Sequence, residues 1–358
     1  MRTIGKELGS SSAIWYKKKN RSPCEDGSSA KETAKAELHF NLWHCKKSKF
    51  LCKENLNCFI DIGILLFNYE DIQEIFIYIP FPVKTEDLKD LSEKLDKQTL
   101  DAIFNEDIST TTDSEGECIK MNMPSSNDEN SSIILWRLDH SSTSNSDLSV
   151  VSDYNRKDSI FKISENAVSR ARDCLEKEDN RNGNERIYFR LRVELNKVNQ
   201  NPFVQTVKPN DNKLLSGFDR LEFVDFRLNE RRNLPDAISR TIHNTENSYF
   251  DVSQIHFLLA TDVNADYVSA HRQFSKCRML ENTLWNAYTD KRLTSHMVVY
   301  HWKAYSGSEK GGSKKGFNAF LKFRTRESSL QTISRYCIIS IIFGFIGSYI
   351  LNLITNYF

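Results

Sequence analysis

The sequence predicts an α+β protein with mixed, mainly antiparallel sheets, about four helices and one C-terminal transmembrane helix. Three observations lead to this prediction. Apolar and polar residues alternate in many short runs, as they do in strands. A few longer segments place apolar residues at helical spacing, and they do not alternate regularly with the strands. The final run, Cys337–Phe358, contains neither a charged residue nor a proline.

Composition and charge narrow the class of protein. The 49 Lys and Arg residues nearly balance 48 Asp and Glu, so nucleic acid is an unlikely partner. Hydrophobic residues make up 39% and occur in bursts between polar stretches, which indicates a folded core with flexible insertions. The eight cysteines lack a regular spacing and no signal peptide is apparent, so we expect reduced thiols in a cytosolic compartment.

Changes in composition along the chain predict its organisation. The predicted parts are a disordered leader at 1–34, a first α+β region at 35–140 with a Ser/Asn-rich insertion at 109–131, a polar linker at 141–159, a second α+β region at 160–326, and a tail anchor at 337–358.

The first region is predicted to contain four strands and one helix. Alternating or apolar runs predict strands at Ala36–His44, Cys58–Asn68, Ile72–Val83 and Ile133–Asp139, the second and third being buried neighbours. The segment Thr85–Gln98 predicts an amphipathic helix that begins at Thr85 and turns its leucines inward.

The second region is predicted to contain three further helices. They span Ser164–Asp179, Asn233–His243 and about Asn264 to Asp290. Ser164 can cap the first, and Pro235 marks the start of the second. Predicted strands lie at Arg186–Leu195, Arg220–Leu228 and Ile255–Asp262, and a closing hairpin joins Met297–Tyr305 to Phe317–Phe323. In Arg186–Leu195, apolar residues alternate with charged ones, which indicates one buried and one solvated face.

The tail anchor has the length of a bilayer span. A helix of about 22 residues rises about 33 Å, close to the roughly 30 Å hydrocarbon core of a bilayer. Positive residues concentrate just before it; they are Lys314, Lys315, Lys322, Arg324, Arg326 and Arg335. Glu327 is the one acidic residue in the same stretch. Flanking positive charge favours the cytoplasmic side, so we expect the lipid bilayer as a partner and the large domain in the cytosol.

Small and polar residues form a stripe along the anchor. Ser340, Gly344 and Ser348 are four residues apart, Gly347 lies beside them, and Asn352 continues the row. Such stripes let apolar helices approach closely in lipid, so the sequence predicts a homo-oligomer. The alternative is that Gly and Ser are simply common in membrane spans.

Two groups of charged residues are candidate binding sites. Arg190, Arg192 and Arg227 lie on strand faces and could hold a carboxylate or phosphate in a cleft. Asp262 and Asp266 follow a predicted central strand, a favoured position for an acidic site. The alternative for each group is a solvated surface with ordinary ion pairs.

The sequence gives no reason to expect a metal or a cofactor. A loose group, His39, His44, Cys45, Cys52 and Cys58, lacks the paired spacing of a zinc site, and the two histidines fall on opposite faces of a strand. Buried structural thiols explain this group better. The loop Lys310–Gly316 lacks the spacing of a phosphate-binding loop.

Two functions remain open. In the first, a tail-anchored, non-enzymatic protein binds a small-molecule signal or a partner protein through its cytosolic domain, and its anchors assemble; membrane perturbation in a stress or antiviral response is one possible output. In the second, the anchor localises an enzyme that acts on a charged or phosphate-bearing substrate through Arg190 and Arg192 or the Asp262 region. No catalytic motif supports the second, so the first is preferred.

Overall fold

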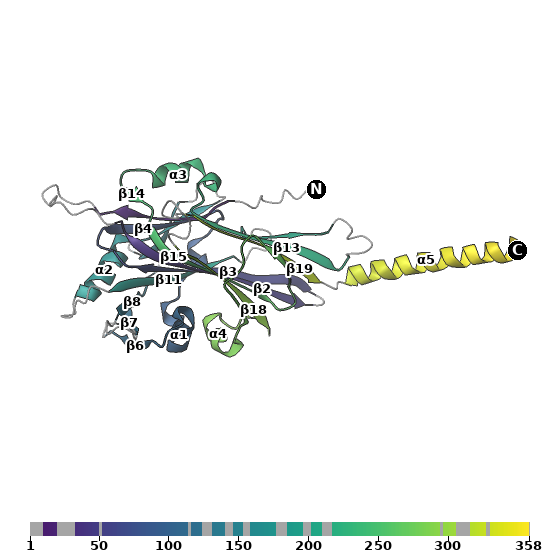
Figure 1. Ribbon diagram of the computed structural model, residues 1–358, viewed down its shortest axis with the longest axis horizontal. Helices are drawn as coiled ribbons and strands as arrows, with labels where there is room; N and C mark the ends of the chain where they lie inside the picture. The colour runs from purple at the N-terminus through teal and green to yellow at the C-terminus, as the bar shows by residue number, and fades with distance from the viewer. Residues whose placement is uncertain are drawn as a thin grey trace.

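The computed structural model describes residues 10–357 except 20–32, 50–51, 114–115, 124–130, 140–145, 153–157, 177–184, 196–201, 210–216, 294–295, 306–315 and 327–329. Within them the chain forms three sheets and five α-helices, one of which is C-terminal and apolar. The predicted α+β class with mixed and antiparallel sheets is therefore confirmed (Figure 1).

A ten-stranded sheet forms the centre of the fold. Its order is β17-β18-β15-β2-β3-β11-β8-β7-β6, with β5 paired to β11. Two neighbouring pairs, β2 with β15 and β8 with β11, are parallel, and the other pairs are antiparallel. The strands are β2 Lys35–Lys49, β3 Cys52–Leu66, β5 Leu88–Asp90, β6 Ser109–Thr112, β7 Cys118–Met123, β8 Ser131–Trp136, β11 Arg186–Glu194, β15 Asp251–Asp262, β17 Lys276–Met279 and β18 Met297–Tyr305.

Two smaller antiparallel sheets contain the remaining strands. The first has the order β14-β1-β4-β10-β9, and the second β12-β13-β19-β16. Their strands are β1 Ala13–Lys18, β4 Ile72–Ile79, β9 Leu148–Ser152, β10 Ser159–Ile163, β14 Asn247–Ser248, β12 Val204–Val207, β13 Asp219–Leu228, β16 Asp266–Ala270 and β19 Phe317–Arg326.

Four short helices accompany the sheets. They are α1 Lys97–Phe104, α2 Glu165–Glu176, α3 Asp236–Ile242 and α4 Asn282–Tyr288, and 3-10 turns lie at Thr85–Asp87, Ser92–Lys94 and Arg231–Asn233. The predicted Ser164 cap and the predicted proline at the helix start are present at two of them. The amide of Ala167 donates to Ser164 Oγ at 3.2 Å before α2, and Pro235 immediately precedes α3.

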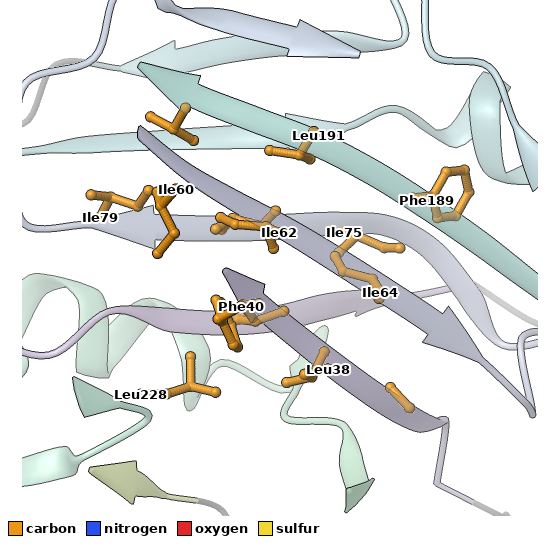
Figure 2. Close-up of a cluster of buried hydrophobic side chains, with 14 of the residues drawn as sticks. Leu38, Phe40, Ile60, Ile62, Ile64, Ile75, Ile79, Phe189, Leu191 and Leu228 are labelled. Atoms are coloured by element: carbon orange, nitrogen blue, oxygen red, sulfur yellow. The ribbon is translucent and has the colours of Figure 1, made fainter. Parts of the chain in front are cut away.

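The main hydrophobic core lies between the large sheet and the two smaller ones. Ile60, Ile62 and Ile64 on one face of β3 pack toward Ile75 and Ile79 of β4 (Figure 2). Strands β3 and β4 were predicted as neighbours, but they belong to different sheets and meet face to face. The opposite face of β3 carries Phe59 and Leu65, which belong to a second core with α1 and α4.

The predicted disordered leader is wrong for residues 13–18. They form β1, which pairs with β4 and β14. Ile14 and Tyr16 enter the main core, whereas Ala13 and Trp15 pack toward α3. The strands that pair with β1, namely β4 and β14, lie far from it in the sequence. The composition of residues 1–34 therefore could not predict that this short apolar run forms a strand.

The predicted helix at Thr85–Gln98 is also wrong. Two 3-10 turns flank β5 there, because β5 pairs with β11 and tertiary pairing overrides local helix preference. The inward leucines are nevertheless buried; they are Leu88, Leu91 and Leu95. The helix begins only at Lys97, where Asp96 Oδ1 accepts the amide of Thr99 at 2.8 Å.

Other predicted segments differ for the same reason. The segment 264–290, predicted as the longest soluble helix, contains β16, β17 and the short α4. Strands β18 and β19 do not form a hairpin, because they pair within different sheets. Strands β6 and β7 occupy parts of the insertion at 109–131, and β9 lies within the predicted linker at 141–159.

The C-terminal helix α5, Leu330–Tyr357, extends away from the sheets (Figure 1). Its Ile333–Tyr357 part has a mean hydropathy of 2.2 and is not buried against the rest of the chain. Its base contacts the segment before β13, where Tyr336 stacks on Phe218 and accepts the Gly217 amide at 3.1 Å. Among the described residues, one helix is long and apolar enough to cross a bilayer, which supports a membrane location.

Replacing Trp15 tests whether β1 belongs to the folded core. Trp15 is 1% exposed and stacks on Phe76 with ring centroids 5.5 Å apart. We expect Trp15→Ala to lower the free energy of unfolding of the detergent-solubilised protein by about 3–5 kcal/mol, measured by chemical denaturation. Lys18→Ala, at the exposed end of β1, should change it by less than about 0.5 kcal/mol. Equal effects of the two variants would contradict the assignment.

Candidate functional site

A cavity of about 340 Å³ lies on the face of the ten-stranded sheet that carries α1 and α4. Its walls come from β2, β15, β17 and β18 of the sheet and from the two helices. Because side chains alternate along a strand, this face carries His39, Asn41 and Trp43 of β2, whereas Leu38 and Phe40 enter the main core.

The side chain of Arg192, from β11, is fully buried on this side of the sheet. It donates from Nε and Nη2 to the two oxygens of Asp61 at 2.7 and 3.1 Å, and its guanidinium lies 4.0 Å from the Phe59 ring centroid. Trp43 and Tyr288 also donate to Asp61 Oδ2, each at 2.8 Å. One carboxylate thus organises a buried network.

Arg190 is equally buried but has a different environment. Its Nη1 donates to Tyr188 Oη at 3.0 Å and its Nε to Tyr288 Oη at 3.1 Å. With the Asn41 amide oriented to satisfy its neighbours, the Asn41 oxygen accepts from Nη2 at 2.8 Å. Among the described residues, no carboxylate lies within ion-pair distance. Burial opposes the charge, but the two hydroxyls and Asp61 outweigh it and raise the pKa of Arg190.

A glycine makes room for these side chains. Gly63 lies opposite Arg190 in the β3–β11 register. A Cβ at this position would overlap Tyr188 Oη and lie 3.0 Å from Arg190 Nη1. The predicted solvated face of β11 is therefore wrong: this face is covered, and its arginines are internal.

A group of histidines and a glutamate lies beside Arg190. Glu37 Oε1 is 2.9 Å from His39 Nε2 and 3.2 Å from His256 Nε2, and His256 Nδ1 is 3.1 Å from His301 Nε2. Burial lowers the pKa of His39 to about 4, although Glu37 opposes the shift. Burial and the neighbouring His256 likewise lower the pKa of His301 to about 3. Hydrogen bonds from the two imidazoles outweigh burial and hold the pKa of Glu37 far below its usual range.

The lining of the cavity is positively charged and partly aromatic. Four cationic side chains and one carboxylate contribute to it; they are Arg190, Lys276, Arg278, Lys303 and Glu106. Apolar walls come from Trp43, Phe104, Leu280, Trp285 and Val299. Trp285 is 4% exposed, and its indole N–H has no hydrogen-bond partner among the described residues. The arrangement suits a small molecule that carries both negative charge and an apolar part.

The other predicted site residues lie elsewhere. Arg227 forms an ion pair with Asp225 at 2.9 Å. Asp262 ends β15, where its Oδ1 accepts the Asn264 amide at 2.8 Å, and Asp266 begins β16 with an exposed side chain. Of the predicted charged residues, only Arg190 lines the cavity.

The predicted His/Cys group does not converge on one point among the described side chains. His39 and His44 lie on opposite faces of β2, as predicted. His44 contacts Cys58 Sγ and Glu222 Oε2, each at 3.2 Å, and these two groups outweigh burial and raise the pKa of His44 to about 10. The Cys52 side chain and residues 310–315 of the predicted loop lie outside the described part of the chain.

The small and polar residues of the anchor are exposed along α5; they are Ser340, Gly344, Gly347, Ser348 and Asn352. A Cβ added at Gly344 or Gly347 would meet no atom within 4 Å.

Sequence reasoning did not identify His256, His301, Lys276 or Lys303 as site residues. The two lysines lie at the rim of the cavity. His39 and His256 are register partners on parallel strands more than two hundred residues apart in sequence. The only sequence signal was the spacing of Glu37 and His39, which places both on one face of a strand.

Comparison with known proteins gives little further guidance. No protein-family model and no curated protein matches the chain. Among solved structures, the chain matches the Mu homology domain of Fcho1 from Danio rerio with a bound Eps15 peptide, at 11% identity and a TM-score of 0.17 over 82% of this chain and 79% of that one. A score this low does not establish a common fold.

Replacing Asp61 tests the buried network. We expect Asp61→Asn to lower the free energy of unfolding by about 3–5 kcal/mol, because Arg192 would lose its buried counter-ion and keep only the more distant, exposed Asp290 at 3.8 Å. Denaturant titration of the purified protein measures this change. Asp266→Asn removes an exposed carboxylate and should alter stability by less than about 0.5 kcal/mol. A loss at Asp61 no larger than at Asp266 would show that the network contributes little.

Proposed function

We propose that this protein is a single-pass, tail-anchored membrane protein whose cytosolic domain binds a small organic anion in the cavity. The observation that carries the proposal is the excess of cationic over acidic side chains in the lining, combined with aromatic walls. Charged groups at the rim attract and orient an anion, while the apolar walls contribute binding free energy by burying its non-polar part.

The chemistry of the lining narrows the ligand class. Lysine and arginine at the rim fit a carboxylate or a phosphate, and the unpaired Trp285 N–H offers one more donor for an acceptor atom. Arg190 lines the cavity but has no exposed surface and donates to Asn41, so it contributes to anion binding mainly through its positive charge. The ligand is therefore a small molecule with one anionic end and one apolar end.

Charge near the anchor supports the cytosolic orientation. Arg324 is exposed near the end of β19, and Arg335 is exposed in the first turns of α5. No acidic or basic residue follows Arg335 within the helix. Positive charge on one flank of a span favours retention on the cytoplasmic side.

Self-association of the anchors would connect ligand binding in the cytosolic domain to an effect at the membrane. Gly344 and Gly347 leave open space on the helix surface, into which a second helix can pack. Ligand binding in the cytosolic domain would then alter the assembly of the spans. Membrane perturbation in a stress or antiviral response is one output consistent with this design.

A membrane-localised enzyme is the alternative. Its support is that histidines and Arg190 line the same cavity and could act on a charged substrate. Arg192 is occupied by Asp61, and Asp262 and Asp266 do not line the cavity. Turnover of an aromatic phosphate by the purified protein would favour this alternative over the binding function.

Binding of phenyl phosphate and benzoate tests the proposed ligand class. We expect both anions, but not neutral benzyl alcohol, to raise the melting temperature of the full-length protein in detergent. The double variant Lys276→Gln/Lys303→Gln should bind the anions roughly 10-fold or more weakly, because two charged donors at the rim are lost. Isothermal titration calorimetry measures the affinities.

A matched control removes two exposed lysines that do not line the cavity. Lys84→Gln/Lys97→Gln makes the same change in net charge and should leave anion affinity unchanged. If the two double variants weaken binding equally, the effect comes from net charge, and the cavity is not the binding site.

Bulky residues on the anchor stripe test self-association. We expect Gly344→Leu/Ser348→Leu to abolish chemical cross-linking between chains in lipid vesicles, because the added side chains keep the helices apart. Circular dichroism should show a folded domain, since Gly344 has no neighbour within 4 Å to clash with. Ile342→Phe adds bulk on the opposite side of the helix and should preserve cross-linking. Undiminished cross-linking in the double variant would refute assembly through this stripe.

A further inference from the structure

Glu37, His39 and His256 form a cluster of metal-ligating side chains that the proposed anion binding does not use. Strands β2 and β15 are parallel, and His39 and His256 are register partners. Glu37 precedes His39 by two residues, so it projects from the same face of β2. The pairing of two strands therefore brings one carboxylate and two imidazoles together without any contribution from a flexible loop.

The distances between these groups approach those of a metal site. Glu37 Oε1 is 2.9 Å from His39 Nε2 and 3.2 Å from His256 Nε2, and the ligand atoms of the three residues all lie within 4.8 Å of one another. Zinc bonds of about 2.0–2.1 Å in tetrahedral geometry separate two ligand atoms by about 3.3 Å. Small side-chain rotations would therefore bring all three onto one ion.

The remaining ring nitrogens are held by other groups. His39 Nδ1 is 3.2 Å from Tyr188 Oη, and His256 Nδ1 is 3.1 Å from His301 Nε2. Each ring is thus held at the nitrogen that faces away from Glu37, while its Nε2 points toward the shared carboxylate. The side-chain amide of Gln254 also contacts His256 Nε2 and would have to rotate away for this nitrogen to bind a metal. Metal-bound histidines are commonly oriented in this way by a partner on the second nitrogen.

The cluster also has the charge and the access that a divalent cation needs. Glu37 is only partly buried, and its carboxylate is shared between the two imidazoles. Arg190, the nearby cation, donates to Tyr188 and not to Glu37. His39 and His256 both line the cavity, so a fourth coordination position would open toward it. Three protein ligands with one open position are typical of catalytic, as opposed to structural, zinc sites.

We propose that Glu37, His39 and His256 bind one first-row divalent metal ion, with Zn²⁺ the simplest match to this ligand set. Water, or an oxygen of a molecule in the cavity, completes the coordination. The metal site adjoins the cavity proposed for the anion, but none of the rim lysines is a metal ligand, so metal binding and anion binding can be tested separately.

Metal titration of the full-length protein in detergent tests the site. The protein carries a histidine-free tag and both Cys118→Ser and Cys174→Ser, because Asp113, Cys118 and Cys174 form a second cluster with metal-ligating groups. After chelation and dialysis, we expect one Zn²⁺ per chain by calorimetry and elemental analysis. Co²⁺ should give a visible absorption band with nitrogen and oxygen ligands.

Conservative variants assign the ligands. Glu37→Gln and His256→Gln should each weaken Zn²⁺ binding by more than about 100-fold, since removal of even an outer partner of a ligand costs about 10–100-fold. His271→Gln changes an exposed histidine outside the cluster and should bind Zn²⁺ as the parent protein does. Far-UV circular dichroism verifies that each variant is folded, and a variant that is not folded is replaced by His39→Gln.

Two results would overturn the proposal. One is the absence of stoichiometric Zn²⁺ or Co²⁺ binding by the folded parent protein. The other is binding by Glu37→Gln and His256→Gln with the affinity of the His271→Gln control. Loss of metal binding with phenyl phosphate binding retained would support the metal site while leaving the anion site separate.

Discussion

The carboxylate of Asp61 is the interaction on which the interior of the cavity face depends. It lies on β3 with no exposed surface and accepts hydrogen bonds from Arg192, Trp43 and Tyr288. Removing two charges from water is costly, and only close ion pairing with additional hydrogen bonds offsets that cost. Tyr288 then bridges from Asp61 to Arg190, so one acid on one strand positions two arginines on another. Helix α4 supplies Tyr288, which explains why a short helix covers this part of the sheet.

The two faces of the ten-stranded sheet have different chemistry because strand side chains alternate. One face is apolar and packs on the smaller sheets, with Ile60, Ile62 and Ile64 as examples (Figure 2). The other face mixes aromatic residues with the buried ionic network, the histidines and the cavity. The apolar core provides the stability that allows charged groups to be held in fixed positions on the other side. Both the anion site and the metal site that we propose depend on this division.

The C-terminal helix follows a different physical rule. Its apolar side chains are exposed; Phe345, for example, is 73% exposed, and no part of the Ile333–Tyr357 span is buried against the sheets. In water such a surface is unfavourable, whereas in a bilayer the lipid covers it and the helix satisfies its own backbone hydrogen bonds. The stacking of Tyr336 on Phe218 is a local contact through which the base of this helix meets the segment before β13.

The sequence by itself determined the properties that depend on local patterns. The long uncharged run at the C-terminus, the strands at Ala36–His44 and Ile255–Asp262, and the Ser164 cap were read correctly, because strand composition and capping act within a few residues. Only the tertiary structure decided which strands pair. Because of that pairing, Leu88–Asp90 and most of 264–290 are not helical, and Ala13–Lys18 forms a strand. The same pairing buries Arg190 and Arg192 and places His39 beside His256. Strand pairing depends on hydrogen bonds between segments that are distant along the chain. The residue pattern within one segment therefore does not identify the strand with which it pairs.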